Sequence, residues 1–275
     1  MPRITSTTVA ALVATLVFMA AASSSLAAQA PARQQPNLDG LSTQFTSSDW
    51  STVRVAKDAL ESLQVQAIPV LVALLGRDEY VKLQNTADLI YPGATEFWGH
   101  GGIVDYDIDW LSVRAGWALE DLTFQNFGFR EGTIDHDALL KAVMSGKADV
   151  PLSSVVGLKP DAAVKRDRRS RAVAAATSWW TRASNGWNRL AAVIDALKSG
   201  DAARQVTGLN WLRHGKTPCV GLGKGTFTET ILPEVRRLTT SEDSGVKEQA
   251  DYLVRDFESK EWYWLSLKEP NQKKR

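Results

Sequence analysis

Apolar residues recur at three- and four-residue intervals between positions 53 and 75, which is the spacing of one face of an α-helix. A first apolar set is followed, after a short break, by a second with the same spacing: Val53, Ala56, Leu60 and Leu63, then Ile68, Leu71, Val72 and Leu75. Pro69 falls in the first turn of the second helix, where a missing backbone N–H is tolerated, and Gly76 is expected to end that helix in a left-handed conformation. Two helices joined by so few residues are expected to lie antiparallel, so the pattern predicts a helical hairpin.

The second half of this hairpin recurs about 160 residues later, in ILPEVRRLTTSED, where Pro233 matches Pro69. Hairpins that recur and cannot bury their own apolar face indicate stacked repeats. At these residues the chain resembles the HEAT repeat family of α-solenoids, and the segment 114–129 is similar to a tryptophan-bearing variant of those repeats. The resemblance covers about 100 of the 275 residues. It implies an all-α, HEAT-like solenoid of stacked helical hairpins with loop insertions, and its motifs are structural rather than chemical.

Other apolar stripes predict further helices. The helix after Asp109 has apolar residues on both sides and is therefore expected to lie at the centre, with Asp109 as its cap. The remaining predicted helices begin at Asp135, at about position 160, near Trp187 and at Asp201, and two more contain 231–238 and 246–257, with Ser241 or Ser244 as the cap between the last two.

The ends of the chain differ in composition from its middle. One early cation, Arg3, is followed by an apolar run and then small residues without an acid, the layout of a secretory signal peptide. The run is shorter than the roughly 20 residues that span a bilayer. We predict a signal peptide over 1–27, a linker over 28–47, a helical repeat domain over 48–265 and a basic tail over 266–275. The protein is accordingly expected to be secreted or periplasmic, with no stable membrane anchor after cleavage.

The charge and cysteine content of the chain argue against some classes of function and of stabilising bond. The chain has 32 basic and 31 acidic residues, so nothing draws it as a whole to nucleic acid or to an anionic membrane. The basic run at 165–171 indicates either a solvated helix face or a contact with an anionic partner. The single cysteine, Cys219, cannot form an internal disulfide. Ten tryptophans indicate wide inter-helix packing or, alternatively, a ring-stacking ligand groove.

The segment 94–110 is the most chemically varied part of the chain, with three glycines, aromatic residues and alternating aspartates. Solenoids often place their specificity in such insertions. Because aromatic side chains dominate interface energetics, the predicted contacts are Trp98, His100, Tyr106 and Trp110. The sequence therefore favours a protein-interaction module that binds another protein and has neither a catalytic motif nor a cofactor.

Two alternatives come from the same residues. A metal-assisted hydrolase would use His100, Asp105 and Asp107, although Trp110 occupies the position where a calcium loop needs glycine. If residues 103–109 form a strand, the aspartates share one face and have structural roles. A carbohydrate-binding module would use exposed tryptophans. The glycine-rich loop 214–226 lacks the spacing of a phosphate-binding loop.

Overall fold

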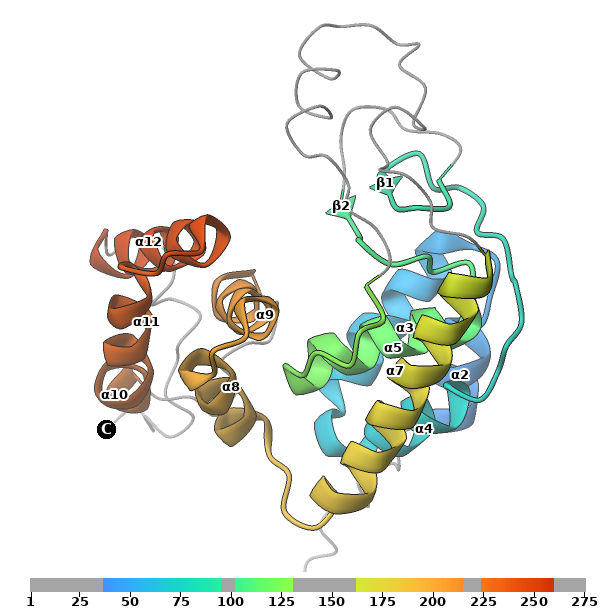
Figure 1. Ribbon diagram of the computed structural model, residues 1–275, viewed down its shortest axis with the longest axis horizontal. Coiled ribbons are helices and arrows are strands. Elements are labelled where there is room, and N and C mark those ends of the chain that lie inside the picture. The colour runs from blue at the N-terminus through green and yellow to red at the C-terminus, as the bar shows by residue number, and fades with distance from the viewer. Residues whose placement is uncertain (1–36, 95–101, 131–161, 215–223, 260–275) are drawn as a thin grey trace, which may run out of the picture. The chain divides into compact units, whose positions relative to one another are not determined.

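The computed structural model describes residues 37–94, 102–130, 162–214 and 224–259, and these residues are mostly helical (Figure 1). The predicted all-α class is confirmed at this level. The elements are α2 (Leu38–Phe45), α3 (Trp50–Ser62), the 3₁₀ turn η1 (Gln64–Gln66), α4 (Ile68–Leu74), β1 (Leu89–Ile90), β2 (Gly102–Ile103), α5 (Leu111–Thr123), α7 (Ala162–Ala183), α8 (Arg189–Lys198), α9 (Ala202–His214), α10 (Lys224–Thr226), the π-helical turn η3 (Phe227–Ile231), α11 (Leu232–Leu238) and α12 (Ser244–Glu258).

Several predicted features lie outside the described residues. They are the signal peptide, the helix from Asp135, the glycine-rich loop with Cys219, and the basic tail. Within the described part of the chain, every helix is too short or too polar to span a bilayer.

The two helices predicted around Leu60 and Ile68 are confirmed as α3 and α4. The Asp49 carboxylate caps α3 by accepting a hydrogen bond of 2.8 Å from the Thr52 N–H. Pro69 lies in the first turn of α4, as predicted. The prediction for Gly76 is wrong, because α4 ends at Leu74 and the backbone at Gly76 has no positive φ. The main packing neighbour of α4 is α5 rather than α3, so the predicted packing of α3 and α4 against each other as a hairpin is not confirmed.

The recurrence of the hairpin's second half is also visible in the structure. Helices α4 and α11 each have seven residues with proline in the first turn. Each buries its first, fourth and seventh residues: Ile68, Leu71 and Leu74 in α4, and Leu232, Val235 and Leu238 in α11. Each also follows an irregular turn, which is 3₁₀ before α4 and π-helical before α11.

Three local predictions are corrected. The linker predicted over 28–47 is wrong from Leu38 onward, because α2 forms there and buries Phe45. The strand considered for 103–109 is limited to Gly102–Ile103, which pairs in parallel with β1. The cap of α12 is Asp243 rather than Ser241 or Ser244, since its carboxylate accepts a 2.9 Å hydrogen bond from the Val246 N–H.

Buried apolar side chains form two clusters. The first cluster contains side chains of α2, α3, α4, α5 and α7, and the second contains side chains of α8, α9, η3, α11 and α12 together with Phe124. Twelve of the 13 residues of α5 are buried, which confirms that this helix is central. Trp50 and Trp117 stack in the first cluster with ring centroids 6.3 Å apart, so these two tryptophans have packing roles.

Candidate functional site

The segment after α4 runs antiparallel to the segment that leads into α5. The Leu111 N–H donates to the Glu79 carbonyl at 2.9 Å, and the Val81 N–H donates to the Asp109 carbonyl at 2.7 Å. Tyr80 and Trp110 are paired between these two bonds. The irregular stretch predicted to carry the site is thereby held against the first cluster.

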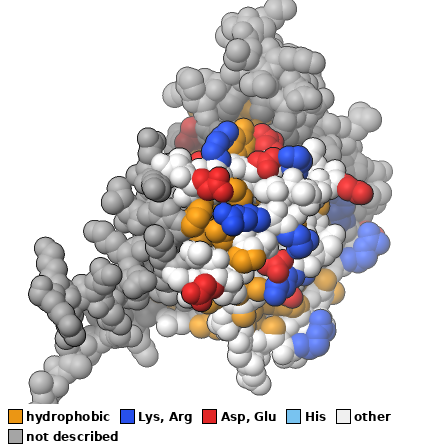
Figure 2. Space-filling model, turned by 90° about the vertical axis from the view of Figure 1, so that its left-hand side faces the viewer, with side chains coloured by type: hydrophobic (Ala, Val, Ile, Leu, Met, Phe, Trp, Pro, Cys, Tyr) orange, Lys and Arg blue, Asp and Glu red, His pale blue; other side chains and the backbone are white. Residues whose placement is uncertain are grey.

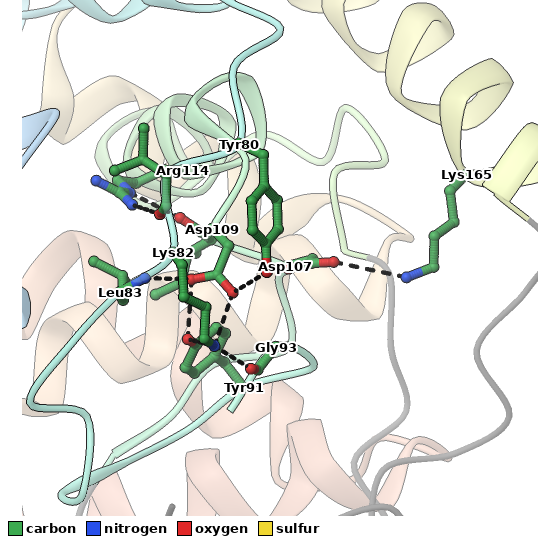
Figure 3. A network of polar contacts seen from close by, with 11 residues as sticks. Tyr80, Lys82, Leu83, Tyr91, Gly93, Asp107, Asp109, Arg114 and Lys165 are labelled. Atoms are coloured by element: carbon green, nitrogen blue, oxygen red, sulfur yellow. Dashed lines mark hydrogen bonds and ion pairs between the residues drawn. The ribbon is translucent and has the colours of Figure 1, made fainter. Parts of the chain in front are cut away.

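The Asp109 carboxylate is the centre of a buried polar network (Figure 3). Its Oδ1 accepts hydrogen bonds from the Leu83 N–H at 2.8 Å and the Tyr91 hydroxyl at 3.0 Å. Its Oδ2 accepts from the Tyr80 hydroxyl at 3.2 Å and from Lys82 Nζ at 3.1 Å. Asp109 was predicted to cap α5, and this is wrong: no side chain caps α5, and its N-cap position is Trp110.

The two tyrosines of this network act as hydrogen-bond donors. Burial, followed by the charge of Asp109, raises the pKa of Tyr80 to about 12 and raises the pKa of Tyr91 as well. Both hydroxyls therefore keep their protons at neutral pH, which suits them to positioning rather than to proton transfer. The backbone at Gly93 lies so close to the Asp109 carboxylate that a Cβ at this position would be 2.3 Å from Asp109 Oδ2. The network therefore requires glycine at this position.

Arg114 connects three chain segments beside this network. Its side chain is fully buried and donates to four backbone carbonyls: Ile108 at 2.8 Å, Ser47 at 2.8 Å, Phe45 at 3.1 Å and Val81 at 3.2 Å. Burial lowers the pKa of Arg114 to about 10, so the guanidinium remains charged at neutral pH. Such a fan of donors satisfies carbonyls that an irregular backbone leaves without partners.

One aromatic ring of this region faces solvent. Tyr80 is 55% exposed, and its ring meets Trp110 edge to face at a centroid distance of 5.4 Å. The Arg169 guanidinium covers the Trp110 ring at 4.0 Å and pairs with Asp78 at 2.8 Å. We call Tyr80, Trp110 and Arg169 the aromatic platform.

The predicted contact residues have different positions. Trp110 belongs to the aromatic platform, whereas Trp98 and His100 lie outside the described residues. Tyr106 is only 3% exposed, so the structure gives it an internal role rather than a contact with a partner. Its hydroxyl donates to Glu120 Oε2 at 2.7 Å and accepts a bond of 3.0 Å from Arg130 Nε.

Glu120 fixes the loop that follows α5. Its Oε1 accepts hydrogen bonds from the N–H groups of Phe127 at 2.6 Å and Gly128 at 3.0 Å. The chain enters this loop at Phe124 with a φ of 56° and continues through Gly128 with a φ of 95°. Burial raises the pKa of Glu120, while the hydrogen bonds from Tyr106 and from backbone N–H groups lower it.

The residues considered for a metal site are not assembled within the described part of the chain. Among those residues, no group of three or more His, Cys, Asp or Glu side chains has the arrangement of a metal site. Asp107 lies 3.7 Å from Lys165 Nζ, and the neighbouring Asp109 already accepts four hydrogen bonds. His100 lies outside the described residues.

The basic run at 165–171 is divided between the protein and solvent. It lies in α7, where Arg169 is buried against Trp110 and Lys165 approaches Asp107. Arg171 is exposed and pairs with Asp167 at 2.9 Å. The run is therefore partly an internal contact and partly a solvated face.

Sequence reasoning missed Tyr80 and Arg169. Tyr80 directly follows three charged residues, Arg77, Asp78 and Glu79, which give no signal for an aromatic contact. Its contact with Trp110 depends on antiparallel pairing between segments about 30 residues apart, for which the irregular sequence gives no periodic signal.

Comparison of the chain with protein-family models, with curated proteins and with solved structures finds no match. The function is therefore argued from the geometry described above.

Proposed function

We propose that this chain is an exported protein-interaction module with HEAT-like stacked helices, and that its partner is a protein that contacts the aromatic platform. The observation that supports this proposal is the exposed ring of Tyr80 on a rigid support. A solvent-facing aromatic residue held at both its ring edge and its hydroxyl loses little conformational freedom on binding.

The support of Tyr80 comes from three neighbouring residues. Asp109 accepts the hydroxyl hydrogen bond, and Trp110 packs against the ring. Arg114 in turn fixes the carbonyl of Val81, the next residue along the chain. Aromatic residues in such settings commonly provide the largest share of binding energy, and the surrounding polar groups exclude water.

Charged side chains lie next to Tyr80 in the sequence and supply a polar rim. Asp78 and Glu79 have side chains that are 62% and 55% exposed. Each is held by an arginine, Arg169 and Arg77 respectively, at distances of 2.8 Å and 2.7 Å. Pre-paired charges of this kind contribute to specificity more than to affinity.

The stacking part of the proposal rests on the recurrence of α4 and α11. Both helices bury the same three positions, and α4 packs on the central helix α5 whereas α11 packs on α12. This repeated arrangement, a short proline-started helix against a longer one, is what units of an α-solenoid provide.

The test uses a photo-crosslinking amino acid placed at position 80 in the cells that produce the protein. We expect one discrete protein adduct from position 80 and none from position 55, because Val55 is similarly exposed at 59% but lies on α3 and is not part of the aromatic platform. Adducts of the same pattern from both positions would refute the placement of the site.

The crosslinked partner then allows a quantitative measurement. Tyr80→Ala is expected to raise the dissociation constant about 30-fold, the effect of a hot-spot residue worth about 2 kcal/mol. Val55→Ala is the matched control and should leave binding within about twofold. Equal binding by both variants would show that Tyr80 is not the anchor.

A further inference from the structure

The outward face of α12 carries acidic and basic side chains, and neighbouring residues do not pair with all of them. A hollow of about 350 Å³ on this face is lined by Ser244, Lys247, Glu248, Asp251, Tyr252 and Arg255. Its members recur at three- and four-residue intervals, so they share one side of the helix. Figure 2 views the side on which α11 and α12 lie in Figure 1 and shows basic and acidic side chains interspersed.

Most charges near α12 are already paired, but two in the hollow are not. Lys247 pairs with Asp251, and Arg236 pairs with Glu258 at 3.4 Å. Among the described residues, Glu248 has no ion-pair partner. Within the same ranges Arg255 likewise has none, and its guanidinium only covers the Tyr252 ring at 4.6 Å. The hollow therefore presents one unpaired carboxylate and one unpaired guanidinium.

The positions of these two charges identify the partner. Glu248 and Arg255 are seven residues apart, which places them on one face with a separation of about 10 Å along the helix. A partner that satisfies both must present a cation and an anion at the same separation in the opposite order. The same helix in antiparallel orientation has this arrangement.

We propose that this face binds a second copy of the chain, with the two α12 helices antiparallel about a two-fold axis between positions 251 and 252. Glu248 of each copy then faces Arg255 of the other, and both pairs form at once because a two-fold interface repeats every contact. Tyr252 of each copy faces Asp251 of the other, so the tyrosine hydroxyl can donate to that carboxylate.

The chemistry of the face excludes stronger alternatives on this side of the molecule. The mixed charges do not favour a polyanion, and apart from Tyr252 the hollow is lined by polar and charged side chains, whereas a small-molecule site is mostly apolar. Ion pairs at an exposed face contribute little affinity and are screened by salt. The dimer is therefore weak, specific in its geometry and sensitive to ionic strength.

Charge reversal tests the pairing directly. The measurement is sedimentation equilibrium of protein isolated from the producing cells, at low salt and at concentrations up to about 1 mM. Wild type is expected to form a dimer that dissociates when salt is added. Glu248→Arg and Arg255→Glu each place like charges opposite one another, and each should raise the dissociation constant by at least about tenfold.

The decisive sample is an equal mixture of the two single variants. In a dimer of either single variant, positions 248 and 255 of the two copies carry like charges. In the mixed dimer each of these two contacts pairs an arginine with a glutamate, so a 1:1 heterodimer should form at wild-type strength. Arg171→Glu on α7, where the side chain is 73% exposed, is the matched control and should leave the dimer unchanged. A wild type that stays monomeric, or a mixture that fails to associate, would overturn the proposal.

Discussion

The two clusters are held together by different kinds of polar interaction. In the first cluster the described chain between α4 and α5 contains a two-residue parallel ladder and takes part in two isolated bridges, so many of its backbone groups bond outside regular structure. Buried Arg114 and Asp109 supply several of those bonds, and buried Glu120 does the same for the loop after α5. In the second cluster the helices satisfy most of their own backbone groups, while Gln205 and Arg237 donate to carbonyls at the end of α8.

The second cluster instead uses short caps and exposed pairs. Asn188, Asp201 and Asp243 accept hydrogen bonds from the first turns of α8, α9 and α12. Ion pairs such as Lys247 with Asp251 lie at the surface, and the pair of Arg213 with Asp256 is partly buried. The comparison teaches that an irregular segment depends on a few buried charges, whereas packed helices distribute their stability over many apolar contacts.

The largest predicted difference between the clusters concerns arginines that bond backbone carbonyls. Arg114→Met leaves four carbonyls without their donor and should lower the free energy of unfolding by about 3 to 5 kcal/mol. Arg237→Met in the second cluster removes a bond of 2.8 Å to the Leu197 carbonyl from a half-exposed side chain. Its expected cost is below about 1 kcal/mol.

Urea unfolding of both variants measures this difference at neutral pH. Wild type and Arg114→Lys complete the series, because a lysine keeps the charge but cannot reach four carbonyls with a planar fork. Comparable losses for Arg114→Met and Arg237→Met would remove the distinction between the two clusters.

Alanine substitutions at one glycine of α5 and one glycine of α9 are expected to change the stability of the protein in opposite directions. A Cβ at Gly116 in α5 would lie 2.3 Å from the ring of the buried Phe129, so Gly116→Ala should cost about 2 to 3 kcal/mol through overpacking. A Cβ at Gly208 in α9 would meet its nearest atom, in Val193, at 3.4 Å. Gly208→Ala should therefore stabilise the protein by about 0.5 to 1 kcal/mol through helix propensity.

Thermal melting of the two alanine variants measures the sign directly. Gly200→Ala, where a Cβ would have open space, is a further reference outside the helices. A stabilising Gly116→Ala would mean that Phe129 does not pack on α5 as described.

The regular elements of both clusters could be predicted from sequence because each has its own periodic signal. The stripes of α3, α4, α5 and α12 alternate with a period near 3.6, and Pro69 and Pro233 mark two helix starts. Helix α2 was missed because a short polar stretch gives a weak period. The burial of Phe45 and the packing of Leu38 and Leu41 against the first cluster explain why it is folded.

The candidate site was only partly predictable for a different reason. The aspartates of 105–109 suggested ligands or a cap, but nothing local shows that Asp109 turns inward to Leu83 and Tyr91. Long-range pairing decides this orientation, and one sequence contains no periodic record of such pairing. Trp110 was predicted from its type alone, whereas its partner Tyr80 needed the three-dimensional contact.

The smallest predicted effect is the pH dependence that buried Glu120 gives the first cluster. Burial raises the pKa of Glu120 in the folded protein above its ordinary value of 4.5. The folded state thus binds this proton more tightly than the unfolded state. The resulting stability is fully present below pH 4.5 and is lost as the pH rises through the raised pKa, with a slope of at most about 1.4 kcal/mol per pH unit.

Glu120→Gln cannot titrate, so the difference in free energy of unfolding between wild type and this variant isolates the effect. Wild type should lose stability relative to the variant as the pH rises from about 4.5, and the difference should be constant at higher pH. Urea unfolding across a pH series measures it. A difference that is independent of pH would show that Glu120 has the same pKa in both states.

A substitution at Tyr106 tests whether the hydrogen bonds of Glu120 set the pH range over which stability is lost. Its hydroxyl bond lowers the pKa of Glu120, so Tyr106→Phe should extend the loss of stability to higher pH. Tyr252→Phe is the matched control, because this tyrosine lies on α12 and contacts Arg213 and Arg255 instead. If both variants shift this pH range equally, the pH dependence does not arise from the hydrogen bonds around Glu120. Buried charges would then not distinguish the first cluster from the second.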